Sequence, residues 1–263
     1  MAVAVLPRLN GTLSKLAKQG ESAAAKAVDL PPGVDEIPES QRPAWRRILI
    51  GAIHGEGLEQ WAIGPMLDGL VHVGLDDESV RRFFKTQGDD ELRHRDLFTA
   101  YLHRHYKATD GAPKLAHRIL YDGILKPLAR TGARKPLRVL LPLLTFERAA
   151  GTLYMNRLIQ CTAGKRMPVM NKLLRSIRQD EARHVAGVGM TCRALIERQP
   201  PKPGERALLI GIVKLVIADM DRKAWWKPGL QRHMESIGLD VNAMNKDNAT
   251  VFAELLRIIH GQD

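Results

Sequence analysis

Apolar side chains recur at three- and four-residue intervals from Ala44 to about Arg198, and strand-like alternation is almost absent. That period places the apolar residues on one face of a helix. The segment "QPPKPGE" at 199–205 ends this region, and helical stretches follow at about 205–226 and 246–260. The pattern predicts an all-α protein.

Within 44–198 the pattern predicts four helices, and each of their inward faces carries carboxylates. The four faces are Leu49, Ala52, Glu56, Glu59 and Ile63; Phe84, Gln87, Glu91, His94, Phe98 and Tyr101; Leu140, Leu143, Glu147, Ala150, Tyr154 and Leu158; and Leu174, Ile177, Glu181, His184, Val188 and Thr191. Because an unpaired buried charge is very costly, these faces predict a cation inside the bundle.

Two of these helices repeat one motif, Asp-Glu-x-Arg-His, as "DDELRH" at 89–94 and "QDEARH" at 179–184. In each copy the Glu and the His lie three residues apart, which puts both on one helix face. With one carboxylate from each of the other helices, the set is that of a di-iron or di-manganese carboxylate bundle. The predicted metal ligands are Glu56, Glu91, His94, Glu147, Glu181 and His184.

The spacing of the carboxylates supports this ligand set. In an antiparallel helix hairpin, two residues lie level when the turn falls midway between them. Gly164 is the midpoint of Glu147 and Glu181, and the turn "VGLDD" at 73–77 contains the midpoint of Glu56 and Glu91. A longer link at about 106–136 fits the crossover of ferritin-like folds. Glu59 is the alternative first-helix ligand, or a neighbouring carboxylate that shifts towards the metals.

The motif also contains charged residues beside the predicted ligands. Asp90, Arg93, Asp180 and Arg183 are expected to surround the ligands directly. A carboxylate that accepts the second N–H of a ligand histidine fixes its tautomer and orientation. The ordinary alternative is a set of surface ion pairs.

Composition limits which domains, membrane segments and disulfides we expect in the chain. Residues 1–43, rich in Ala, Lys, Gly and Pro, are expected to form a weakly ordered arm, 44–198 the bundle, and 199–263 a helical extension. No apolar run is long enough for a signal peptide or a membrane span. The two cysteines do not make a disulfide framework and fit a cytoplasmic location.

The charge of the chain predicts acidic partners. Lys and Arg number 40 against 29 Asp and Glu, a net charge of +11. Such a surface attracts acidic molecules. Zinc-finger, RNP and glycine-rich phosphate-loop motifs of nucleic-acid and nucleotide binding are absent. An acidic protein or an anionic membrane surface therefore remains as the expected partner. The alternative is that the positive charge only keeps the surface soluble.

These motifs resemble the oxygen-activating di-iron carboxylate enzymes: bacterial multicomponent monooxygenases, the ribonucleotide reductase small subunit and, most closely, the soluble acyl-carrier-protein desaturases. The resemblance rests on "DELRHRDLFTAYL" at 90–102, "TFERAAG" at 145–151 and "QDEARHV" at 179–185, and it covers about 44–198. It implies a ferritin-like bundle in which the six predicted ligands hold two irons, with manganese accepted by the same ligands. Related bundles often form homodimers.

The resemblance also implies an activity. A reduced centre would use dioxygen to desaturate, or hydroxylate, a fatty acyl chain on an acyl carrier protein, with electrons from a ferredoxin-like donor. Ala150 stands where desaturases have a threonine, and Ile177 where arylamine N-oxygenases have a further histidine. Two alternatives stay open: a di-iron oxygenase of a small molecule in specialised metabolism, and a ferritin- or rubrerythrin-like protein for iron storage or peroxide removal. A long apolar cavity ending at the metals would favour the first activity.

Overall fold

The computed structural model describes the chain except residues 1, 25–28, 57–58, 76, 109–118, 165, 221–228 and 263, and it leaves out the side chains of 2–6, 24 and 59–61. All regular elements of the described part are helices, which confirms the all-α prediction. They are α1 (Ala2–Ala24), η1 (Glu39–Gln41), α2 (Arg42–Gly55), α3 (Glu59–His72), α4 (Glu78–Tyr106), η2 (Ile119–Leu125), α6 (Lys126–Arg130), η3 (Thr131–Ala133), α7 (Leu137–Phe146), η4 (Glu147–Tyr154), α8 (Met155–Cys161), α9 (Pro168–Arg198), α10 (Pro203–Met220), α11 (Leu230–Ser236) and α12 (Val241–Ile259).

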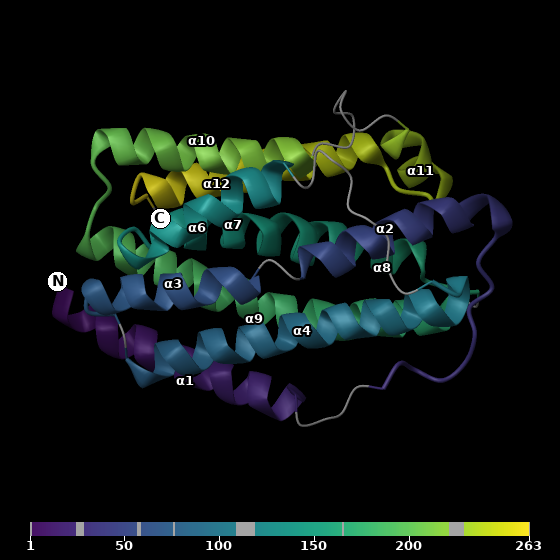
Figure 1. The fold of residues 1–263 in the computed structure, drawn as a ribbon, viewed down its shortest axis with the longest axis horizontal. Helices are drawn as coiled ribbons and strands as arrows, with labels where there is room; N and C mark the ends of the chain where they lie inside the picture. The colour runs from purple at the N-terminus through teal and green to yellow at the C-terminus, as the bar shows by residue number, and fades with distance from the viewer. Residues whose placement is uncertain are drawn as a thin grey trace.

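Four helical rods form the central bundle (Figure 1). α4 and α9 are single long helices, whereas α2 with α3, and α7 with η4 and α8, are rods made of successive pieces. α2 and α3 contact α4, α4 contacts α9, and α9 contacts α7, η4 and α8. Both predicted hairpin turns are present, between α3 and α4 and between α8 and α9.

Local sequence explains where the two long helices begin. The carboxylate of Asp77 accepts a 2.7 Å hydrogen bond from the backbone N–H of Ser79, an N-cap that starts α4. Pro168 opens α9, at a position where a missing N–H costs nothing. Gly74, with φ +66°, makes the turn that leads into α4.

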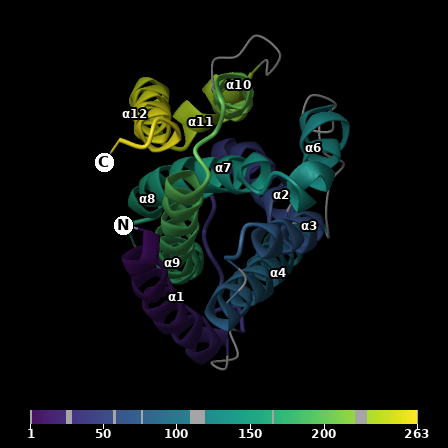
Figure 2. The same cartoon turned by 90° about the vertical axis from the view of Figure 1, so that its left-hand side faces the viewer.

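The amino-terminal segment differs from the weakly ordered arm expected for 1–43. Helix α1 packs lengthwise against α4 and α9 and buries Leu9, Leu13 and Ala17 (Figure 2). Gly20 lets α1 approach closely, since a Cβ there would lie 3.1 Å from the Cβ of Thr86. The four-residue apolar spacing outweighs the Gly- and Lys-rich composition because it gives α1 one face to bury.

The segment between α1 and α2 fastens the far end of the bundle. Asp35 is buried, and its carboxylate accepts 2.8 Å hydrogen bonds from the backbone N–H groups of Val169 and Met170. It also accepts a 2.6 Å hydrogen bond from the hydroxyl of Tyr101. Burial, together with this contact, raises the pKa of Tyr101 far above its ordinary value. One carboxylate thus caps α9 and ties α4 to it.

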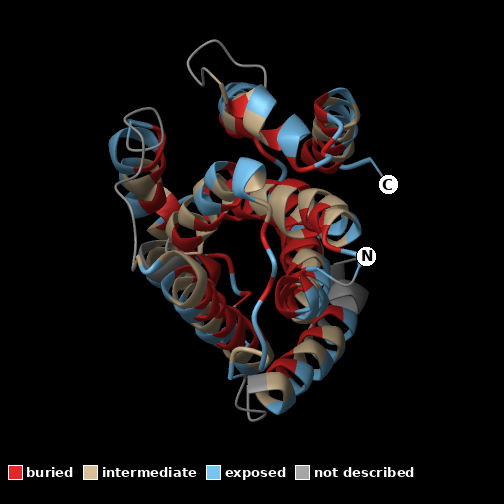
Figure 3. Ribbon diagram, turned by 90° about the vertical axis from the view of Figure 1, so that its right-hand side faces the viewer, coloured by how far each residue is buried: buried red, intermediate tan, exposed pale blue. Residues whose placement is uncertain are grey.

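The carboxy-terminal helices lie over the α7 side of the bundle. α10 contacts α7 and α12, and α12 contacts α7, η4 and α9. The two predicted helical stretches correspond to α10 and α12, although 221–226 lies outside the described residues. Buried residues line the inward faces of all these layers (Figure 3). None of the described helices has the length and apolarity to span a membrane.

Candidate metal centre

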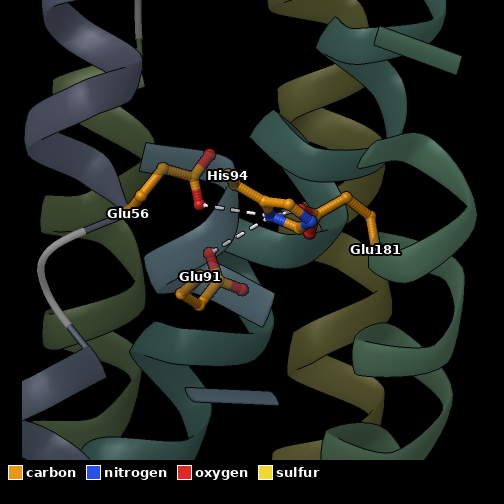
Figure 4. A group of neighbouring side chains, drawn as sticks. All are labelled: Glu56, Glu91, His94 and Glu181. Atoms are coloured by element: carbon orange, nitrogen blue, oxygen red, sulfur yellow. Dashed lines mark ion pairs between the residues drawn. The ribbon is translucent and has the colours of Figure 1, made fainter. Parts of the chain in front are cut away.

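The structure brings the six predicted ligands together in the middle of the bundle. Their side chains form two groups of four, Glu56–Glu91–His94–Glu181 and Glu91–Glu147–Glu181–His184, with all ligand atoms of a group within 4.8 Å of one another. Glu91 and Glu181 belong to both groups, so each is placed to bridge two ions. The first group is drawn in Figure 4, where the carboxylates turn towards the imidazole of His94.

The distances suit ligands that share an ion. Nδ1 of His94 lies 3.7 Å from an oxygen of Glu56, 3.7 Å from one of Glu91 and 3.3 Å from one of Glu181. Nδ1 of His184 lies 3.0 Å from Glu91, 3.5 Å from Glu147 and 3.7 Å from Glu181. Ligand atoms about 2.1 Å from one hard cation are themselves about 3 Å apart.

Burial provides an independent test of the fit to metal. The side chain of Glu56 is 13% exposed, and those of the other five ligands are at most 5% exposed. Nδ1 of His94 and Nδ1 of His184 are buried and have no hydrogen-bond partner in the described part of the protein. Two orphaned imidazole nitrogens that face four carboxylates fit a pair of cations, because such groups are otherwise costly to bury.

The other nitrogen of each imidazole contacts an aspartate of the opposite helix. Nε2 of His94, on α4, lies 3.1 Å from Asp180 on α9, and Nε2 of His184, on α9, lies 3.2 Å from Asp90 on α4. An N–H donated from Nε2 leaves Nδ1 unprotonated and turned to the metal position. Each copy of the motif therefore orients the histidine of the other copy.

The arginines of the motif complete this network. Arg93 donates 2.8 Å to Asp180 and also contacts Asp90. Arg183 donates 2.8 Å to Asp90 and 2.6 Å to Asp180. The four predicted neighbours thus lie where the motif places them, as a buried cross-link between α4 and α9. These are not surface ion pairs, since the side chain of Asp90 is 1% exposed and that of Asp180 is 7% exposed.

Protonation of the ligands follows from their crowding. Burial by itself lowers the pKa of His94, but its contacts with Asp180 and Glu181 outweigh this and hold that pKa well above its usual range. The same balance raises the pKa of His184, with Glu147 as the main charge. Burial and the charge of Glu181 raise the pKa of Glu147, whereas hydrogen bonds with Glu147, His184 and His94 outweigh burial and lower the pKa of Glu181. Metal binding has to displace these protons.

The first-helix ligand lies at an interruption of its helix, which differs from the continuous helix expected through Glu56 and Glu59. α2 ends at Gly55, Glu56 caps it, and α3 begins at Glu59. Glu56 is the carboxylate that reaches the cluster. The side chain of Glu59 lies outside the description, so its alternative role stays a prediction.

The third helix is also irregular at its ligand. From Glu147 to Tyr154 it is π-helical, a rare geometry that is frequent at functional sites. Gly151 in this segment leaves the room that Glu181 occupies: a Cβ there would lie 2.4 Å from a carboxylate oxygen of Glu181. A side chain at 151 would push the shared carboxylate out of place.

Sequence reasoning missed a direct partner of the cluster. The amide nitrogen of Gln87 donates a 2.7 Å hydrogen bond to Oε1 of Glu147. Gln87 is 1% exposed and lies one helical turn before Glu91 on α4. The signal was its place on the apolar face of that helix, where a polar residue needs a partner.

A cavity of about 540 Å³ reaches the cluster, and Glu56, Glu91, Glu147 and Glu181 form part of its wall. The remaining wall is mainly apolar, and it comes from α2, α3, α4, η2, α6, α7, η4, α8, α9, α10 and α11. Its largest apolar members are Trp45, Leu49, Phe98, Tyr121, Leu125, Leu143, Phe146, Met155, Leu158, Leu174, Met220 and Met234. Charged groups at its wall beyond the cluster are Arg46, Arg47, Arg138 and Asp219.

Comparison with known proteins identifies the fold. No model of a protein family matches the chain, and no curated protein sequence matches it. Among solved structures, an R2-like ligand-binding oxidase with an aerobically reconstituted metal cofactor matches with TM-score 0.70 and 16% identity over 94% of this chain and 92% of its own. The R2-like ligand-binding oxidase from Sulfolobus acidocaldarius matches with TM-score 0.68 and 15% identity over 96% and 91% of the two chains.

A third match is a variant of an R2-like ligand-binding oxidase with an aerobically reconstituted Mn/Fe cofactor, with TM-score 0.69 and 16% identity over 94% of this chain and 92% of its own. At this level of identity the likeness concerns the fold, and it confirms a ferritin-like helical bundle that extends over nearly the whole chain. The expected closeness to acyl-carrier-protein desaturases is not supported by these structures.

Proposed function

We propose that this protein is an oxygen-dependent oxidoreductase with a dinuclear metal centre, of two irons or of manganese and iron, held by Glu56, Glu91, His94, Glu147, Glu181 and His184. The buried cluster of four carboxylates and two imidazoles supports this proposal. The Mn/Fe cofactor of an R2-like oxidase with the same fold supports it as well. When bound, the metal pair supplies the electrons that reduce dioxygen.

The chain's own residues prepare the site for that chemistry. Four ionised carboxylates balance two divalent cations, so the buried centre is neutral once the ligand protons leave. Asp90 and Asp180 hold His184 and His94 in the tautomer that presents Nδ1 to the metals. Arg93 and Arg183 donate hydrogen bonds to these aspartates and hold them in place, and the apolar cavity wall excludes water from the open side.

The cavity is the observation that supports a substrate class. Its apolar wall begins at the metal ligands, and its volume of about 540 Å³ is in the range of small-molecule sites. An aliphatic chain, such as a fatty acyl group, would place one carbon beside the centre and bury the rest. The reaction is then desaturation or hydroxylation of that chain. Delivery by an acyl carrier protein and reduction by a ferredoxin-like donor fit the net charge of +11.

Two other functions are less well supported by the cavity. A protein that stores iron or removes peroxide needs no apolar cavity of this size beside its metals. A small polar substrate would lose its hydrogen bonds to water against this wall. An apolar small molecule of specialised metabolism remains the second candidate.

Metal analysis tests the proposal first. Protein purified after expression with iron and manganese should hold about two metal ions per chain, as dimetal bundles do. Glu147→Ala, which removes a ligand of one group only, should hold about one ion fewer per chain while keeping its helical circular dichroism spectrum. The loaded protein, after reduction, should consume dioxygen faster when a C12–C18 fatty acid or acyl carrier protein conjugate is present. A folded protein that binds neither metal contradicts the proposal.

A further inference from the structure

The two metal positions have the same kinds of ligand but differ in how the terminal carboxylate is held. Glu147 lies in the bundle interior, and the amide of Gln87 donates to its Oε1 at 2.7 Å. Glu56, the corresponding carboxylate of the other group, caps the end of α2 and is more exposed. No described side-chain amide donates to Glu56.

The acceptor atom of this hydrogen bond is the one turned to the metal position. Oε1 of Glu147 lies 3.5 Å from Nδ1 of His184, its partner in the second group. A carboxylate oxygen has two lone-pair directions, and the amide of Gln87 takes one of them. Oε1 therefore has one lone-pair direction left, which would face an ion at the His184 position. Turning Glu147 away from this orientation would break a buried hydrogen bond, which is costly.

The repeated motif shows that this arrangement is one-sided. Gln87 lies four residues before Glu91 on α4, and the residue four before Glu181 on α9 is Ile177. Both positions are buried, at 1% and 0% exposure. The two helices match in their Asp, Glu, Arg and His, so the difference between the amide of Gln87 and the sec-butyl group of Ile177 breaks the symmetry of the centre.

We infer that Gln87 is a positioning residue that holds Glu147 in one orientation towards the His184 position and makes the two metal positions unequal. The position with Glu147 and His184 holds its ion with a fixed ligand. At the position with Glu56 and His94, the carboxylate lies at the end of α2 and is more exposed, so it would be held less firmly. This inference rests on the proposed dimetal function.

Manganese titration of the metal-free protein tests it, with free Mn²⁺ followed by its electron paramagnetic resonance signal. His94→Ala and His184→Ala identify which binding step belongs to which position. Gln87→Met keeps length and volume but removes the amide. It should weaken binding at the His184 position about 10-fold or more, as loss of an outer hydrogen bond to a ligand does, and change the His94 position by less than about twofold.

A matched variant distinguishes this effect from general loosening of the core. Ile177→Met changes packing at the same register of α9 without involving an amide, and both binding steps should stay within about twofold of the unchanged protein. Thermal unfolding of the metal-free proteins checks that each variant folds. Gln87→Asn, whose shorter side chain no longer reaches Glu147, serves as a second variant and should show the same one-sided loss.

The outcomes separate the inference from the proposed function. If the unchanged protein does not bind two ions, the proposed function itself fails. If it binds two, and Gln87→Met and Gln87→Asn change neither step or weaken both equally, Gln87 does not position Glu147 and only the inference is overturned. If Gln87→Met and Gln87→Asn weaken only the binding step that His184→Ala abolishes, the inference is established.

Discussion

The two pairs of helices that surround the centre are built differently. α4 and α9 are uninterrupted over 29 and 31 residues, repeat one motif, and hold each other through Asp–His and Asp–Arg contacts. The other pair is interrupted at its ligands: α2 stops beside Glu56, and the rod of α7 becomes π-helical at Glu147. The rigid pair supplies the shared ligands, whereas the irregular pair supplies the terminal carboxylates and much of the cavity wall.

The largest expected effect separates a shared ligand from a terminal one. Glu181→Ala removes a carboxylate common to both groups and should leave about no metal per chain, while Glu56→Ala should retain about one of two ions. Metal content after dialysis, measured by mass spectrometry, decides this. An equal loss of metal in both variants would mean that the rigid and irregular pairs of helices contribute equally to metal binding.

The next effect tests the rigidity of the α4–α9 pair. Asp90→Ala removes one of the two buried carboxylates that pair with Arg93 and Arg183, leaves Asp180 as their remaining acceptor, and should lower the free energy of unfolding by about 3–5 kcal/mol. Its neighbour Asp89 provides the control, because it forms an exposed ion pair with Lys85, and Asp89→Ala should cost at most about 1 kcal/mol. Urea unfolding of the metal-free proteins measures both, and similar values would show that the cross-link does not stabilise the pair.

A smaller effect is expected in the π-helical segment. Gly151→Ala places a methyl group against the carboxylate of Glu181 and should destabilise the protein by about 1–3 kcal/mol and reduce metal content. Gly211→Ala, on the open face of α10, meets no atom within 4 Å and should stabilise by up to about 1 kcal/mol. Melting temperatures with and without Mn²⁺ test both. Full metal content in Gly151→Ala would contradict the assigned role of this glycine.

The smallest effect concerns the tie between the irregular pair and the outer layer. Arg138 on α7 donates to Glu205 on α10 at 2.8 and 2.6 Å, and this contact lowers the pKa of Glu205 from its ordinary 4.5. Because the folded pKa is the lower one, the stabilisation is present above pH 4.5 and is lost as the pH falls through the folded value.

Glu205→Gln should therefore cost at most about 1 kcal/mol near neutral pH and progressively less below that range, with metal binding unchanged. Urea unfolding between pH 3 and 7 follows the difference. A difference that grows on acidification has the wrong sign for this contact.

The rigid pair, α4 and α9, is the part of the site that the sequence predicts best. A duplicated motif on continuous helices keeps its spacing, so the sequence alone predicts that Glu91, His94, Glu181 and His184 lie on facing sides of their helices. The all-α class and both hairpin turns followed from the same periodicity and are confirmed. The domain boundaries and the ligand roles stay predictions.

The sequence pattern did not predict the irregular features, because an argument from helical periodicity assumes an unbroken helix. A π-helical segment uses the same residue types as an α-helix, so Glu147–Tyr154 gave no separate signal. The break at Glu56 and the hydrogen bond from Gln87 depend on how separate helices meet. The helix α1 was not predicted either, because the Ala-, Lys-, Gly- and Pro-rich composition of residues 1–43 obscured its apolar spacing.

The crossed contacts between the two motif copies have a consequence for how this sequence can change. Asp90 serves the histidine of α9, and Asp180 serves the histidine of α4. A substitution in one copy therefore alters the contacts of a ligand in the other copy. As a result, the two copies of the motif cannot change independently in evolution. Descendants of this chain should acquire new specificity through α2, α7 and η4, while the two copies stay matched or are lost together.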